Sequence, residues 1–372
     1  MTRPRRPEQF VSALLDWFAH EARDLPWRRT LDPYAIWVSE IMLQQTQVKT
    51  VIPYWERWMR ELPDIASLAS ASPEKIHKLW EGLGYYTRVR NLQKAAQQLV
   101  RENGGQFPQP FDSVLALTGI GRYTAGAITS IAFNQPSPIL DGNVIRVLTR
   151  LHGIEENPRD KNTNAKLWQL AEELVHAAAA HKSRITLHSS LLLSGPCSAL
   201  NQSLMELGAL ICTPKQPNCE VCPWRKPCVA RATNRVDALP NLGKRAAATD
   251  RQFVAFLVQH RGKWLVQQRP AGVVNAHLWE FPNAEIDATT TDLLPTATKL
   301  LGGKPAQFEP LVTIKHSITR YRISLEAILI SRAKALPAKE ASCWLSIEEL
   351  DALAFTSAHR KVLTALRRKM AG

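Results

Sequence analysis

Along residues 1–230, apolar positions recur at spacings of three and four, with polar positions between them. This spacing puts apolar side chains on one face of a helix, so it predicts amphipathic helices that share a core. The pattern is clearest over residues 9–21, 36–48, 74–82, 91–102 and 164–180.

After residue 250 the pattern changes to alternation and to runs of β-branched residues, which favour strands. Such runs cover 253–259, 264–268, 311–316 and 322–330, and a helical pattern returns over 358–370. The intervening stretch, 233–250, holds helix-breaking residues such as Pro240 and Gly243 and is typical of a linker. We therefore expect a helical domain over 1–232, a linker over 233–250 and a mixed α and β domain over 251–372.

The chain has 372 residues, of which 45% are apolar, enough to bury more than one core. Its formal charge of +14 predicts a polyanionic partner, because Lys and Arg side chains replace counterions along a phosphate backbone. Residues 1–250 hold 30 Lys and Arg against 23 Asp and Glu, and residues 251–372 hold 17 against 10. Both parts are expected to face nucleic acid, although charge alone is also consistent with a plain solvated surface.

The N-terminal sequence is charged and lacks the apolar stretch of a signal peptide, and no apolar run reaches the length of a membrane span. Two cysteines, Cys197 and Cys343, stand alone, so nothing indicates a disulfide framework. We expect a monomer of the bacterial cytosol that does not bind membranes.

The other four cysteines form a C-x6-C-x2-C-x5-C run. They are Cys212, Cys219, Cys222 and Cys228. Thiolate sulfur is a soft ligand, and four thiolates on one short loop suit an iron-sulfur cluster or a tetrahedral zinc ion. Disulfides or structural thiols are the alternative. The spacing by itself does not separate the two metals.

The densest chemistry in the helical part begins at residues 117–121, Leu-Thr-Gly-Ile-Gly, before a new helix from Tyr123. Such a turn directs backbone N–H groups outward, and Gly119 and Gly121 let a phosphate come close. An ordinary helix-helix turn gives the same pattern. Asp141 follows about twenty residues later, and taken alone it predicts a helix N-cap.

The hairpin turn, the aspartate and the cysteine loop, in this order, resemble the endonuclease III superfamily of DNA glycosylases. The resemblance implies a mostly α N-terminal domain with the helix-hairpin-helix DNA glycosylase fold. It also implies a [4Fe-4S] cluster, in preference to zinc, on the loop 212–228.

Three strings point to one branch of this superfamily. Residues 25–28 (LPWR), 37–46 (WVSEIMLQQT) and 82–86 (GLGYY) resemble the adenine DNA glycosylases, the MutY family. The resemblance implies base-excision repair on double-stranded DNA, with removal of adenine opposite 8-oxoguanine or guanine.

The same resemblance makes Glu40 the general acid and Asp141 the second carboxylate, with Asn143 in support of the aspartate. Adenine leaves poorly as an anion, so the base must be protonated first, and a glutamate of raised pKa in a partly desolvated pocket can supply that proton. An ionised aspartate then stabilises the oxocarbenium character of the sugar. Without the resemblance, Glu40 would be equally consistent with a buried ion pair. Positions matched to base or DNA contact are Arg28, Gln45, Thr46, Leu83, Tyr85, Gly119, Gly121 and Gln202.

Tyr123 stands where bifunctional relatives such as endonuclease III carry a lysine nucleophile. A phenol forms no Schiff base, so we expect hydrolysis without efficient strand cleavage. Some thymine-mismatch glycosylases share this tyrosine, and such an enzyme is one rival function. A non-catalytic, cluster-bearing DNA-binding protein is another, although the presence of both Glu40 and Asp141 disfavours it.

The C-terminal part resembles the α+β Nudix-like domain of the same family, through residues 276–282 and 316–321. The catalytic Nudix signature is absent from the sequence, so we expect this domain to recognise the lesion and not to hydrolyse nucleotides. Relatives often carry Phe-Ser-His in the inspecting loop, where this chain has Ile318-Thr319-Arg320. Thr319 keeps a hydroxyl and Arg320 keeps a donor.

About fifteen residues, 185–199, stand where the family runs directly into the helix of Gln202. The segment contains three leucines at 191–193 and then Ser-Gly-Pro at 194–196, which breaks a helix. We expect a loop that bulges out and leaves the pocket intact.

Overall fold

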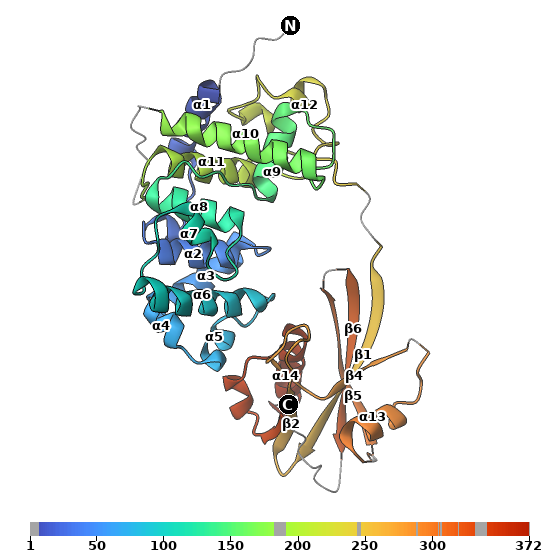
Figure 1. Cartoon of the computed structure of the whole chain (residues 1–372). Helices are drawn as coiled ribbons and strands as arrows, with labels where there is room; N and C mark the ends of the chain where they lie inside the picture. The colour runs from blue at the N-terminus through green and yellow to red at the C-terminus, as the bar shows by residue number, and fades with distance from the viewer. Residues whose placement is uncertain are drawn as a thin grey trace. The chain divides into compact units, whose positions relative to one another are not determined.

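The computed structural model describes residues 7–181, 191–243, 247–287, 289–303, 305, 307–318, 320–331 and 341–371. The chain divides into two compact units (Figure 1). Unit 1 comprises Met1–Ser70 and Asn91–Arg245, and unit 2 comprises Ala71–Arg90 and Ala246–Gly372. Among the described residues, no helix combines the length and the apolar character needed to span a membrane.

Unit 1 is helical. Its helices are α1 (Pro7–Glu21), η1 (Pro26–Arg28), α2 (Pro33–Leu43), α3 (Val48–Glu61), α4 (Ile65–Ser70), most of α6 (Thr87–Asn103), α7 (Phe111–Leu115), α8 (Arg122–Phe133), α9 (Gly142–His152), α10 (Lys161–Ala179), α11 (Pro196–Leu210), η2 (Cys219–Val221) and α12 (Val229–Ala232). The predicted helices at 9–21, 91–102 and 164–180 are confirmed to within a few residues.

The prediction of one helix over 36–48 is wrong, because α2 ends at Leu43 and α3 begins at Val48. Gln45 has φ +59°, a left-handed conformation that an α-helix does not accommodate. The apolar pattern runs across this break because α2 is largely buried and α3 places Val51 in the interior. The turn that results carries Gln45 and Thr46.

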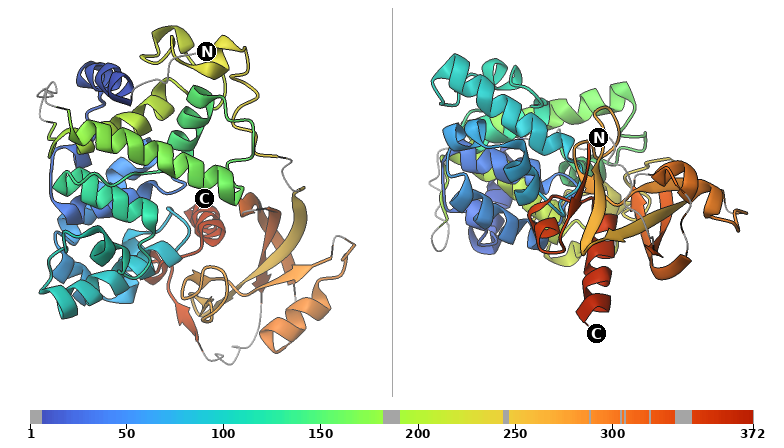
Figure 2. Two further views of the ribbon diagram at one scale, coloured as in Figure 1. Left: turned by 45° about the horizontal axis from the view of Figure 1, so that its top comes forward. Right: turned by 90° about the horizontal axis from the view of Figure 1, so that it is seen from below.

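The apolar faces of α1, α9, α10 and α11 meet in the main core of unit 1. Figure 2 shows the ribbon of these helices from two further sides. Leu148 of α9, Val175 of α10 and Leu204 of α11 are fully buried there. Burial of one such side chain contributes roughly 1.5–3 kcal/mol. This core fixes α9 and α11, which carry Asn143 and Gln202.

In its described part, unit 2 holds a seven-stranded mixed sheet of order β3-β2-β1-β6-β5, with β4 also paired to β1 and β7 to β2. Its elements are α5 (Pro73–Leu79), β1 (Thr249–His260), β2 (Lys263–Gln268), β3 (Trp279–Glu280), β4 (Asn283–Ile286), α13 (Leu294–Leu301), β5 (Gln307–Ile318), β6 (Tyr321–Ser331), β7 (Ser342–Leu345), η3 (Glu349–Ala352) and α14 (Ser357–Ala371). β1 and β6 run parallel, and the other pairs are antiparallel.

The sheet has a core on each face. Successive residues of β1 point to opposite faces. Leu257 packs in a hydrophobic cluster with α14, and Phe256 packs in a second cluster with α13. This alternation follows from the two-residue period of a strand. The two helices therefore cover opposite faces of the sheet (Figure 1).

The segment predicted as a linker is partly built into the two units. Leu239 is buried, and its carbonyl oxygen accepts a hydrogen bond from Arg150 Nε at 2.9 Å. At the other end, β1 already begins at Thr249. Residues 244–246 lie outside the described residues.

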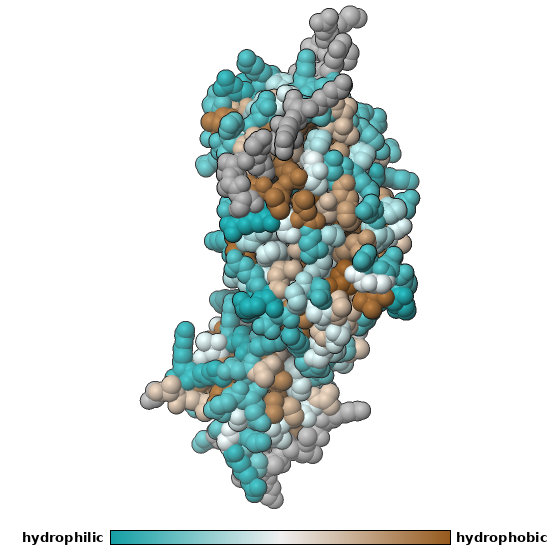
Figure 3. Space-filling model, turned by 90° about the vertical axis from the view of Figure 1, so that its left-hand side faces the viewer, coloured by the Kyte–Doolittle hydropathy of each residue, from teal (hydrophilic) through white to brown (hydrophobic). Residues whose placement is uncertain are grey.

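The surface carries many hydrophilic side chains, and apolar ones gather in a few patches on the face drawn in Figure 3. Large apolar side chains that remain exposed among the described residues include Tyr85, Leu192, Leu242 and Val274. Of these, Leu192 belongs to the segment between α10 and α11.

Candidate active site

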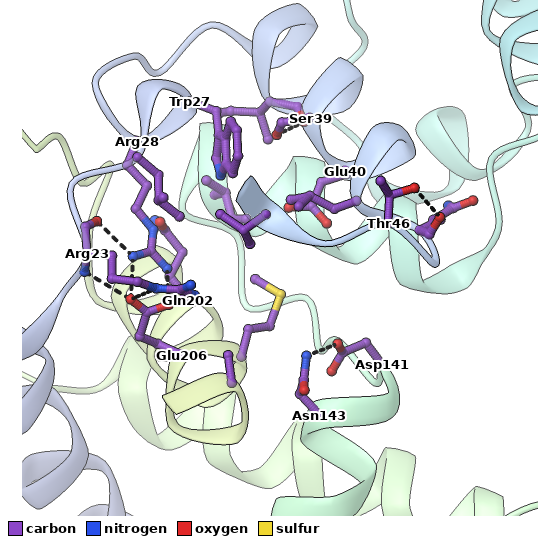
Figure 4. Close-up of a pocket in the computed structure, with 18 of the residues that line it drawn as sticks. Arg23, Trp27, Arg28, Ser39, Glu40, Thr46, Asp141, Asn143, Gln202 and Glu206 are labelled. Atoms are coloured by element: carbon purple, nitrogen blue, oxygen red, sulfur yellow. Dashed lines mark hydrogen bonds and ion pairs between the residues drawn. The ribbon is translucent and has the colours of Figure 1, made fainter. Parts of the chain in front are cut away.

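A pocket of about 520 Å³ opens in unit 1 among η1, α2, α8, α9 and α11. Pockets of roughly 300–1,000 Å³ are typical of small-molecule sites. Residues that line it include Arg23, Trp27, Arg28, Ser39, Glu40, Gln45, Thr46, Tyr123, Asp141, Asn143, Gln202, Met205 and Glu206. Figure 4 shows Arg23, Arg28, Gln202 and Glu206 gathered on one side of it and Asp141 with Asn143 on another.

Glu40 lies on α2 with only 5% of its surface exposed. The hydroxyl of Tyr123, from the first turn of α8, donates a hydrogen bond to Glu40 Oε2 at 2.5 Å. Burial raises the pKa of Glu40 to about 7, against the lowering effect of the Tyr123 bond; the nearby Asp141 adds to the rise. Glu40 is thus a carboxyl group that holds a proton near neutral pH.

Asp141 is the N-cap of α9, and it also lines the pocket. Its Oδ1 accepts the backbone N–H of Val144 at 2.8 Å, and its Oδ2 accepts Asn143 Nδ2 at 2.9 Å. Burial raises its pKa, while these bonds act in the opposite direction. The positive end of the α9 dipole also favours the anion. Asp141 therefore has the N-cap role predicted from sequence, and the same carboxylate also faces the pocket.

Glu206 and Arg23 were not predicted as site residues. Glu206 is 1% exposed and forms bidentate pairs with Arg23 (2.9 and 2.7 Å) and with Arg28 (3.0 and 3.0 Å). Burial alone would raise its pKa, but the two guanidinium groups hold that pKa at about 2. The sequence did contain one indication of Glu206: it lies four residues after Gln202, so the two side chains share one helix face.

Gln202 and Arg28, both predicted, reach the same side of the pocket. Gln202 Nε2 donates to Ser198 Oγ at 3.1 Å, which orients the amide. Arg28 uses three of its N–H donors, two toward Glu206 and one toward the Arg23 carbonyl oxygen. A guanidinium has five donors, so others remain to meet a bound group.

The predicted hairpin turn joins α7 to α8. Gly119 has φ +76°, and a Cβ there would lie 2.5 Å from the Asn91 side chain, so the turn requires glycine on both counts. Around Gly121, the N-cap of α8, a Cβ would meet no atom within 4 Å. The N–H groups that begin α8 are thus open to an anion.

The other predicted contact residues lie in unit 2 or beyond what is described. Leu83 is buried and Tyr85 is 49% exposed, on a turn where Trp80 Nε1 donates to the Gly84 carbonyl oxygen at 3.0 Å. Arg320 is exposed and donates to Tyr321 Oη at 3.1 Å. Thr319 lies outside the described residues.

The four cysteines of the loop line one small hollow beside Arg150, and none of the four is in a disulfide. Burial, with the neighbouring thiols Cys212, Cys228 and Cys219, raises the pKa of Cys222 to about 12. Within the described residues, no group of three or more His, Cys, Asp or Glu side chains is arranged to hold a single metal ion. Four sulfurs around one hollow do fit the donor set of an iron-sulfur cluster, which is larger than an ion.

The expectation that 185–199 bulges out as a loop needs correction in its described part. Leu191 is 7% exposed and packs against Phe18 and Ala22. Residues from Pro196 onward belong to α11, which keeps Gln202 in the pocket. Residues 182–190 lie outside the described residues.

A buried, proton-bearing glutamate on α2 and an aspartate that caps α9 line one pocket, and a glycine hairpin joins α7 to α8. This combination is typical of a helix-hairpin-helix DNA glycosylase. Residues 38–173 match the family model described as HhH-GPD superfamily base excision DNA repair protein, and residues 253–365 match that of a NUDIX domain. A thermostable thymine-DNA glycosylase is similar in structure, with a TM-score of 0.52 and 28% identity over 61% of this chain and 97% of its own. The predicted fold class is confirmed.

Relatives specify the family more narrowly. The adenine DNA glycosylase of Mus musculus is 34% identical over 95% of this chain and 77% of its own length. The Homo sapiens enzyme is 32% identical over 98% of this chain and 75% of its own length. The enzyme of Buchnera aphidicola subsp. Baizongia pistaciae is 30% identical over 96% of this chain and 97% of its own length. The chain belongs to the adenine DNA glycosylase family.

Proposed function

We propose that the protein hydrolyses the N-glycosidic bond of adenine opposite 8-oxoguanine or guanine in double-stranded DNA, as the first step of base-excision repair. The observation that carries this proposal is Glu40, a buried carboxyl group with a pKa of about 7 in a pocket that also holds Asp141. A proton donor and an anion in one pocket are what depurination of adenine needs.

In the proposed reaction, adenine leaves the duplex and enters the pocket. Glu40 gives its proton to a ring nitrogen of adenine, which we propose to be N7, and the Tyr123 hydroxyl stabilises the carboxylate that forms. As the C1′–N9 bond breaks, Asp141, held by Asn143 and Val144, stabilises the positive charge on the sugar until water adds to C1′ and gives up a proton. The pocket is lined, in the described residues, without a lysine, so we propose base removal without strand cleavage.

Adenine presents an acceptor, N1, next to a donor, the 6-amino group. The side of the pocket with Arg28 and Gln202 offers the complementary pair: a guanidinium N–H for N1 and an amide oxygen for the amino group. Glu206 already accepts bonds from two arginines, so we assign it to holding Arg28 in place.

Binding of the duplex is proposed to use backbone N–H groups at Gly119 and Gly121, with Leu83 and Tyr85 filling the space that the flipped base leaves. Exposed basic residues on the cysteine loop add phosphate contacts; these are Lys215, Arg225 and Lys226. Recognition of the opposing base is proposed for the loop at Ile318-Thr319-Arg320.

The test is adenine release from duplexes with A opposite 8-oxoguanine, A opposite G and T opposite G, and from fully paired DNA. We expect release from the first two, with an intact strand until alkali is added. Release of thymine from T opposite G in place of adenine would favour the thymine-mismatch alternative, for which the similar thymine-DNA glycosylase fold is the supporting observation.

Because Glu40 must be protonated and Asp141 ionised, kcat/KM for adenine release should depend on pH with two limbs. We expect an alkaline limb centred near pH 7, the pKa of Glu40, with a loss of about tenfold for each pH unit above it. The acid limb belongs to Asp141 and should lie above its ordinary pKa of 3.8, because that pKa is raised. Single-turnover rates from pH 4 to 9 check this, and a rate that climbs steadily through pH 8 would contradict it.

We propose that Cys212, Cys219, Cys222 and Cys228 hold a [4Fe-4S] cluster, which would fasten the loop to the catalytic unit. The purified protein should show a broad visible absorbance band, which zinc does not give. Cys222→Ser should lose most of that band, while Cys343→Ser, at an isolated cysteine of unit 2, should keep it. A colourless protein that carries zinc would refute the assignment.

A further inference from the structure

The segment 191–195 ends the stretch that separates α10 from α11, and it is hydrogen-bonded to two residues that line the pocket. The backbone N–H of Leu192 donates to the Arg28 carbonyl oxygen at 2.9 Å. Arg28 is the last residue of η1, where a carbonyl has no partner within the helix itself. The segment therefore holds the main chain of a pocket residue directly.

A second contact runs through the side chains. Leu191 is 93% buried in a small cluster with Phe18 and Ala22, flanked by Trp17 and Leu193. The guanidinium of Arg28 lies over the Phe18 ring, 5.3 Å from its centroid. Phe18 thus packs against Leu191 and against the Arg28 guanidinium, so it links the segment to a pocket side chain.

The far end of the segment is anchored separately. Ser194 Oγ donates to the Ile131 carbonyl oxygen at 2.6 Å, and Ile131 lines the pocket. Gly195 packs so closely that a Cβ would lie 2.3 Å from the Asn134 side chain, whose Oδ1 accepts the N–H of Cys197 at 2.9 Å. These bonds fix where α11 starts, and with it Gln202 and Glu206.

We propose that the segment 191–195 positions Arg28 in the base pocket, with Leu191 acting through Phe18 and Leu192 through its backbone N–H. The segment touches neither base nor sugar, so its residues are positioning residues. This inference rests on the proposed function, in which Arg28 contacts adenine. By positioning Arg28, residues 191–195 would affect how well adenine binds in the pocket.

The experiment uses the full chain and single-turnover release of adenine opposite 8-oxoguanine. Leu191→Ala should slow release about tenfold, and Leu191→Met, which refills the cluster, should restore it to within about twofold. Leu242→Ala makes the same chemical change at an exposed site and should leave the rate unchanged. Binding of a duplex with a tetrahydrofuran abasic site should also be unchanged by Leu191→Ala, because no base occupies the pocket.

A double-mutant cycle distinguishes a loss of Arg28 positioning from a general loss of structure in Leu191→Ala. If Leu191 acts through Arg28, then Leu191→Ala should add less than about twofold to the loss already caused by Arg28→Gln. Losses that multiply, a loss of abasic-site binding, or an unchanged rate for Leu191→Ala would each overturn the inference. If Leu191→Ala fails to fold by circular dichroism, Leu191→Val is put through the same cycle. Wild-type protein that releases no adenine would refute the proposed function instead.

Discussion

Glu40→Gln is expected to slow adenine release by two to four orders of magnitude, about the usual worth of a general acid, while making the protein more stable at neutral pH. Glutamine keeps the shape of the side chain and can still accept the Tyr123 hydrogen bond, but it has no acidic proton for the base. General acid catalysis is typically worth about 10²- to 10⁴-fold, so we expect a loss in that range. Single-turnover release of adenine opposite 8-oxoguanine measures it.

The gain in stability follows from the sign of the pKa shift. The folded-state pKa of about 7 lies above the ordinary value of 4.5, so ionised Glu40 opposes folding. This cost is absent below pH 4.5, grows as the pH rises, and is complete above pH 7. At about 1.4 kcal/mol per pKa unit, it amounts to roughly 3–4 kcal/mol at most.

Denaturant unfolding at pH 5 and pH 8 tests the predicted gain in stability. The free energy of unfolding of Glu40→Gln should exceed that of the wild type by more at pH 8 than at pH 5. Glu56→Gln, on the exposed face of α3, is the matched control and should change neither rate nor stability appreciably. An active Glu40→Gln protein, or one less stable than the wild type at pH 8, would contradict the assignment of Glu40 as the acid.

Several residues that were predicted from short sequence patterns lie in the pocket, although their catalytic roles stay predictions. Glu40 was predicted from a string of neighbours, and Asp141 from its distance to the hairpin; the structure brings both to one pocket. The side chain of an aspartate that caps a helix is oriented by a bond to a backbone N–H three residues later in the chain. Its orientation therefore depends only on nearby sequence. Its support by Asn143, two residues on, is equally local.

Residues whose role depends on distant partners were missed. Glu206 and Arg23 are 183 residues apart, and neither has a neighbour in sequence that indicates an ion pair. Leu191 was expected in an outward loop. Three leucines in a row before a helix break show neither the helical nor the strand spacing of apolar residues. Its burial comes from Phe18 and Ala22 of another part of the chain, which no local pattern reveals.

Glu206→Ala is expected to give the largest loss of stability among changes at the pocket, together with loss of adenine release. The change leaves two guanidinium groups without their carboxylate, and Arg28 is only 7% exposed. Breaking a buried ion pair by removing one partner costs about 3–5 kcal/mol. Because Arg28 would also lose its alignment, we expect adenine release to fall about 100-fold or more, as when a positioned donor is lost.

Thermal unfolding and single-turnover release measure these two effects, and Glu172→Ala, on the exposed side of α10, is the matched control. The pH dependence offers a separate check. The folded pKa of Glu206, about 2, lies below the ordinary 4.5, so its stabilisation is present above pH 4.5 and lost as the pH falls toward 2. The stability gap between wild type and Glu206→Ala should therefore narrow on acidification. A gap that is constant from pH 7 to pH 3 would show that the variant suffers from lost packing and not from a broken ion pair.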